Sequence, residues 1–149
     1  MLLDPQSGCC LPTPRRWDAF VAEPGDVEYL DVEDLVALAA RLLGHPAPIR
    51  DLGLLGSAAA RPAVNAFGED AYPEIWLKAA ALLRSLVDNH PRVDGNERLG
   101  WLSIAVFFEL NGIDAALVEE DDVYDFVLSV AAGQSSVEEI AHGLCRTVG

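Results

Sequence analysis

Two strongly apolar stretches, joined by a short polar turn, constrain the fold of this chain more than any other feature. Residues 73–89 and residues 96–112 each carry apolar side chains around most of a helical circumference, so each is expected to form a buried helix. The polar turn between them reads His90-Pro91-Arg92-Val93-Asp94-Gly95-Asn96-Glu97-Arg98. We therefore predict a central pair of helices with this turn at one end of the core.

The rest of the chain is expected to add helices around this pair. Helical apolar periodicity follows four groups of expected N-cap residues: Asp31, Asp51, Asp121 or Asp122, and Ser135 or Ser136. Residues 63–72 are irregular and are expected to form a loop or flap rather than an element. Aromatic residues make up only 7% of the chain, and β-branched runs are scarce. The prediction is an all-α fold of six helices.

The domain organisation follows from the length and from a change of pattern near residue 28. The 149 residues, 51% of them apolar, suffice for one domain with a substantial core. Residues 1–28 contain repeated prolines and no sustained period, so we expect an N-terminal tail that is flexible or loosely docked. Residues 29–149 are expected to form the domain.

Charge and composition restrict the partners and the compartment. With 10 basic and 24 acidic residues the formal net charge is −14, and the basic residues are not clustered, so DNA and other polyanions are disfavoured as partners. No apolar stretch reaches the length of about 18 residues that a membrane span needs. The three cysteines follow no disulfide or zinc pattern, which is typical of a protein in a reducing cytoplasm.

The polar turn has the residue types of an anion site at a helix start. The free N–H groups and dipole of the second helix favour an anion, Gly95-Asn96 lets backbone approach a phosphate, and Arg98 adds a planar cation. His90 is placed to take a proton from an attacking hydroxyl, and Asp94 to orient it or to hold Mg²⁺. These residues together predict a site for phosphate chemistry.

A purely structural explanation fits the same turn. Asp94 and Glu97 have the spacing of an Asp-x-x-Glu capping box, His90-Pro91 can simply end the preceding helix, and Arg98 can face water. On spacing alone, this explanation is favoured over a catalytic one.

The turn also resembles the signature of the Fic/Doc (Fido) superfamily, His-x-Phe-x-Asp/Glu-Gly/Ala-Asn-Gly/Lys-Arg. It matches that signature at His90, Asp94, Gly95, Asn96 and Arg98. Segments outside the turn resemble the death-on-curing (Doc) branch in particular. These segments are residues 29–35, 50–55, 60–62, 78–82 and 109–112. The resemblance covers roughly residues 29–148, and it shifts the balance towards a catalytic turn.

The resemblance implies a six-helix Fido fold and a toxin of a type II toxin–antitoxin module that uses ATP with Mg²⁺. By resemblance, a Doc-type toxin is a kinase that transfers the terminal phosphoryl group to a threonine of elongation factor Tu and stops translation. Most Fic relatives transfer AMP instead. The implied protein partner is a Phd-like antitoxin, whose disordered tail folds as a helix in an apolar groove near the first helices.

Residue roles carry over by position. His90 is then the base on the target hydroxyl, and Asp94 positions the reacting groups or Mg²⁺. Gly95, Asn96 and Arg98 hold phosphates.

The flap carries a second implied role. Phe67, Gly68 and Tyr72 belong to this segment, which aligns the target in the family.

Lys78 and Arg61 also match Doc positions, and they are expected either to serve the site or to form salt bridges within the acidic scaffold.

The chain departs from the family pattern at three positions. Glu97 stands where Doc members usually have lysine, a charge reversal of about 1–4 kcal/mol for charges some 4 Å apart. Arg92 replaces a core phenylalanine and is a candidate to replace the lost cation, while Ala39 stands where many Doc sequences have histidine.

Three interpretations stay open. If Arg92 compensates for Glu97, the protein is an active transferase of phosphoryl or AMP. If it does not, the domain is weakened and is kept for binding an antitoxin or another partner. A structural helical adaptor that binds no nucleotide is the third. Retention of His90 and Arg98 favours the first interpretation.

Overall fold

The computed structural model describes residues 27–44, 49–89, 96–115, 118–133 and 135–148. Six α-helices dominate this part of the chain: α3 (Val32–Leu43), α4 (Leu52–Ala60), α5 (Ile75–Asn89), α6 (Asn96–Leu110), α7 (Glu120–Ala131) and α8 (Val137–Val148). A short 3-10 helix, η1 (Arg61–Ala63), follows α4. The predicted helical fold is confirmed, while the expected tail lies almost wholly outside the described residues. None of the helices described is long and apolar enough to cross a membrane.

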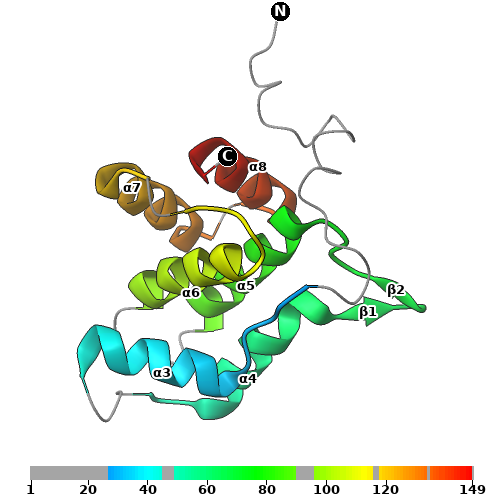
Figure 1. The fold of residues 1–149 in the computed structure, drawn as a ribbon, viewed down its shortest axis with the longest axis horizontal. Helices are drawn as coiled ribbons and strands as arrows, with labels where there is room; N and C mark the ends of the chain where they lie inside the picture. Colours follow the sequence, from blue (N-terminus) through cyan, green and yellow to red (C-terminus); the bar gives the residue numbers. More distant parts are fainter. Residues whose placement is uncertain (1–26, 45–48, 90–95, 116–117, 134, 149) are drawn as a thin grey trace, which may run out of the picture.

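Helices α5 and α6 form the centre of the molecule, as predicted. They run between the pair α3 and α4 on one side and the pair α7 and α8 on the other (Figure 1). Trp76 and Phe108 are completely buried, and their ring centroids lie 5.1 Å apart between the two helices. At Gly100 the helices approach so closely that an added Cβ would lie 2.8 Å from Leu83 Cδ1. The core is therefore built on this contact.

Three of the predicted N-caps are confirmed by their hydrogen bonds. Asp31 Oδ1 accepts from the Asp34 N–H at 2.8 Å, and Asp34 Oδ2 accepts from the Asp31 N–H at 3.0 Å, which completes a capping box. Asp51 Oδ1 accepts from the Leu54 N–H at 3.0 Å. Ser136 Oγ likewise accepts from the Glu139 N–H at 3.1 Å. These side chains set where α3, α4 and α8 begin.

The fourth predicted cap was wrong. The N-cap of α7 is Glu119, and not Asp121 or Asp122, which both lie inside the helix. Glu119 makes no side-chain capping bond. Acidic residues are favourable throughout a first helical turn because of the helix dipole, so an acidic run indicates a helix start without selecting the cap.

Residues 64–71 form a hairpin, within the segment 63–72 where the sequence led us to expect no regular element. Strands β1 (Asn65–Ala66) and β2 (Glu69–Asp70) pair antiparallel, with Asn65 opposite Asp70 and Ala66 opposite Glu69. The hairpin projects from the helical body (Figure 1). Phe67 and Gly68 at its tip both have positive φ, 55° and 83°, as a type I′ turn requires. The turn was missed because Phe-Gly lacks the Asn-Gly or Asp-Gly signal.

Helix α8 packs so tightly on α7 that one glycine is obligatory. A Cβ added at Gly143 would overlap the Phe126 ring. Gly143→Ala is therefore expected to lower the free energy of unfolding by about 1–3 kcal/mol through overpacking. Chemical denaturation measures the change.

The matched control is Gly56→Ala in α4, where the nearest side-chain atom to an added Cβ, on Val32, is 4.0 Å away. That control is expected to stabilise by about 0.5–1 kcal/mol through backbone entropy. Equal effects of the two substitutions would contradict tight packing at Gly143.

Candidate functional site

The ends of the two central helices carry the polar turn. Helix α5 ends at Asn89 and α6 begins at Asn96, so residues 90–95 connect the C-terminal end of one buried helix to the N-terminal end of the other. Four predicted site residues, His90, Arg92, Asp94 and Gly95, lie outside the described residues. The structure thus places both supports of the turn, while the roles of these four residues stay predictions.

Asn96 and Arg98 occupy contrasting positions in the first turn of α6. Asn96 is only 6% exposed, so its amide is held within the protein. Arg98 is exposed, and within the described ranges its guanidinium forms no ion pair. A guanidinium at the N-terminal end of a helix adds to the positive end of the helix dipole. Arg98 therefore adds positive charge at this end of α6, and the predicted anion site there stays a prediction.

Glu97 lies between these two residues and is half-buried. A carboxylate in the first turn of a helix stabilises the helix by about 0.3–1 kcal/mol, because it faces the positive end of the dipole. The same charge repels a phosphate that approaches this end. Glu97 thus stabilises α6 and disfavours an anionic ligand there.

The predicted flap is the β1–β2 hairpin. Phe67 is fully exposed at its tip, Gly68 completes the turn, and Tyr72 is half-buried just after β2. The hairpin is closed at its base by a hydrogen bond of 2.9 Å from the Ala71 N–H to the Val64 carbonyl. The flap therefore presents an aromatic side chain to solvent on a defined turn.

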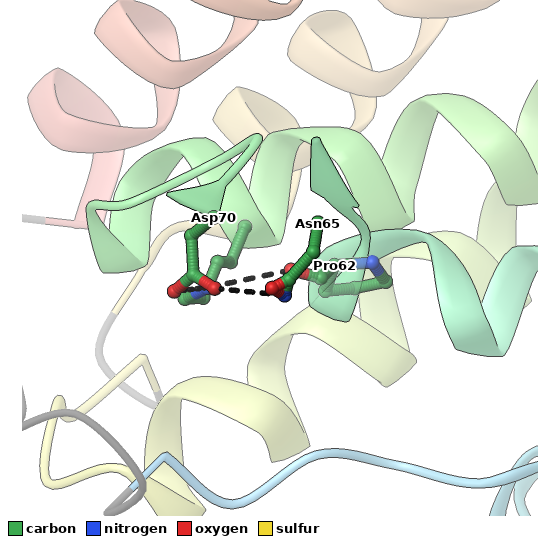
Figure 2. A network of polar contacts seen from close by, with 4 residues as sticks. Pro62, Asn65 and Asp70 are labelled. Carbon is green, nitrogen blue, oxygen red and sulfur yellow. Dashed lines mark hydrogen bonds and ion pairs between the residues drawn. The ribbon is translucent and has the colours of Figure 1, made fainter. Parts of the chain in front are cut away.

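A polar network fixes the base of the hairpin to α5. Lys78 Nζ lies 3.2 Å from Asp70 Oδ2 and donates to the Pro62 carbonyl at 3.4 Å. Asn65 Nδ2 donates to Asp70 Oδ1 at 3.3 Å, from the opposite strand (Figure 2). Lys78 itself is 1% exposed. Of the two explanations for Lys78, the structure supports the ion pair.

Arg61, the other basic residue of unassigned role, is exposed and lines a polar cleft of about 340 Å³. Ser57, Arg84 and Ser85 contribute to the same cleft. Among the described residues Arg61 makes no ion pair, so the salt-bridge explanation does not hold for it there.

The described residues offer no ready-made metal cage. Within those ranges, no group of three or more His, Cys, Asp or Glu side chains is placed to hold a metal ion. His142 lies half-buried in α8, where burial, with a smaller effect of Arg146, lowers its pKa.

Comparison with known proteins points to one family. The profile of the Fic/DOC family matches residues 29–108, a range that includes the hairpin, α5, the polar turn and all but the last two residues of α6. A protein named Toxin Doc from Mycolicibacterium smegmatis is 43% identical over 115 residues, which cover 76% of this chain and 88% of that protein. The similarity thus extends over most of the described helical body.

The flap tip generates a prediction about stability. A bulky residue with positive φ is strained by roughly 1 kcal/mol, and Asn-Gly is the preferred pair for this turn. Phe67→Asn is therefore expected to raise the free energy of unfolding by about 1 kcal/mol, measured by chemical denaturation. Since Phe67 is fully exposed, little packing is lost. A destabilised Phe67→Asn variant would contradict the described turn.

Proposed function

Because the chain belongs to the Fic/Doc family, we propose that it is the toxin of a type II toxin–antitoxin module. In this proposal it is an ATP-dependent transferase that phosphorylates a threonine or serine hydroxyl of a cytoplasmic protein, elongation factor Tu, and blocks translation. The observation that carries the proposal is the match of the turn His90 to Arg98 to the family signature, at the junction of two buried helices.

The proposed chemistry is an in-line phosphoryl transfer. The target hydroxyl oxygen attacks the γ-phosphorus while His90 takes its proton, the bond from the γ-phosphorus to the bridging oxygen breaks, and ADP leaves. Gly95, Asn96 and Arg98 hold phosphates at the N-terminal end of α6. Asp94 is the proposed protein ligand of Mg²⁺, which commonly uses one or two carboxylates together with substrate phosphates and would neutralise phosphate charge.

The described structure supports this assignment through rigidity and charge. A transferase of this kind works mainly by positioning, so its groups need a rigid support. The helices α5 and α6 supply one, because their facing residues are buried on both sides of the turn. The exposed Arg98, which makes no ion pair with another described residue, supplies a cation for a phosphate. The hairpin provides a surface that can align a target segment.

A second candidate is a weakened Fic/Doc domain that mainly binds a partner. Glu97 favours it, because a half-buried carboxylate lies in the helical turn that should receive phosphates. Arg92 is the proposed compensating cation in the active version. Both versions include a Phd-like antitoxin as the partner, whose tail would fold as a helix on an apolar groove near the first helices.

The first experiment on function identifies the group transferred. The protein is incubated with Mg²⁺ and ATP labelled on either the γ- or the α-phosphate, with elongation factor Tu or bacterial lysate as target. We expect label from γ only, and a loss of at least about a hundredfold in His90→Ala, because the base is removed. Label from α indicates AMP transfer. Growth arrest that persists in His90→Ala would contradict a catalytic toxin.

The second experiment tests the charge at position 97. Glu97→Lys is expected to tighten ATP binding at least about fivefold, since replacing repulsion with attraction contributes roughly 1 kcal/mol or more. Calorimetry with ATP and Mg²⁺ measures the effect. Asp125→Lys, exposed on α7, gives the same change in net charge as a control. Equal tightening in both variants would assign the effect to net charge alone.

A further inference from the structure

The ammonium of Lys78 is the point where three separate segments of the chain meet. It lies 3.2 Å from Asp70 Oδ2 in β2, donates to the Pro62 carbonyl of η1 at 3.4 Å, and lies 5.5 Å from the ring centre of Tyr29. An ammonium has three N–H donors, and a carboxylate, a carbonyl and an aromatic face account for three interactions. The cation is thus fully engaged inside the protein.

Burial makes this ion pair different from a surface pair. The Lys78 side chain is 2% exposed and its partner Asp70 is 46% exposed. In the other ion pair of the described residues, Arg84–Asp88, both side chains are exposed, at 39% and 44%, and the pair links neighbouring turns of α5. Removing the partner of a buried charge is costly, while an exposed pair contributes little. Both cations, Lys78 and Arg84, lie on α5, so the exposed pair is a control for the pair with the buried cation.

The hairpin depends on this contact because it has little else to hold it. All of its strand residues are exposed, and an isolated two-stranded hairpin is only marginally stable in water. Asp70 accepts from Asn65 with one oxygen and meets Lys78 with the other. The carboxylate therefore joins both strands to α5 (Figure 2). The direction in which the tip points is set at this carboxylate.

We propose that Lys78 is a positioning residue that orients the flap relative to α5 and thereby places the target hydroxyl at the motif turn. Helix α5 carries Lys78 near one end and leads into the turn at the other, so one rigid element relates the flap to the reacting groups. Lys78 acts through the flap and touches neither ATP nor the hydroxyl. The inference rests on the proposed transferase function.

The test separates use of the protein target from use of ATP. Lys78→Met keeps the apolar stem and removes the charge, Asp70→Asn weakens the pair from its exposed side, and Arg84→Met is the control. We expect kcat/KM for the protein target to fall about tenfold to a hundredfold in the first two, through a misplaced target. The KM for ATP should stay within twofold of the wild-type value.

Two further variants test whether Lys78 and Asp70 act together. The double variant Lys78→Met/Asp70→Asn should lose no more kcat/KM for the target than Lys78→Met alone, and Lys78→Arg should recover part of that loss.

Two other results would contradict the positioning role of Lys78. Target kcat/KM in Lys78→Met within twofold of Arg84→Met would overturn the proposal, and an equal loss for ATP and target would assign Lys78 to general stability. If Lys78→Met does not fold, Asp70→Asn carries the comparison.

A second measurement does not depend on transfer. Amide exchange of Ala71, whose N–H closes the hairpin base, should accelerate in Lys78→Met and not in Arg84→Met. Unchanged exchange overturns the anchor even if the wild-type protein proves inactive. Accelerated exchange in an inactive protein would reject the transferase function while leaving the anchor intact.

Discussion

The burial of α5 against α6 is the contact on which the rest of the structure depends. Each helix is too apolar to face water, so each needs cover on nearly every side, and the four outer helices supply it. In the sequence, the polar residues 90–95 join these two apolar helices. The segment of proposed reactivity thus joins the ends of two helices whose facing residues are buried in the core.

Much of the fold could be predicted from the sequence because the signals for its helix starts are local. Asp31, Asp51 and Ser136 bond to backbone within their own helix starts, so sequence spacing alone locates them. The cap of α7 was misplaced because several adjacent carboxylates suit the same turn. The hairpin was missed for a different reason, since its strands are short, exposed and held by Lys78 from a later helix.

Less of the candidate site than of the fold could be predicted from the sequence. The identity of the turn came from the family signature, and the structure adds the burial of Asn96 and the exposure of Arg98. The two explanations for Lys78 were indistinguishable in the sequence, because an ion pair between segments leaves no spacing signal. Its partner Asp70 is one of many carboxylates in an acidic chain, and only the fold selects it.

The close approach at Gly100 has a consequence for the geometry of the turn. Gly100 stands one helical turn beyond Asn96, and Leu83 occupies the space that a methyl group at Gly100 would need. The missing methyl group therefore lets α5 and α6 lie close together near the ends that the turn joins. Helix α6 therefore packs directly against α5 within about one turn of its first residue. The spacing of the two helices beside the proposed site thus depends on the absence of a side chain at Gly100, two residues beyond Arg98.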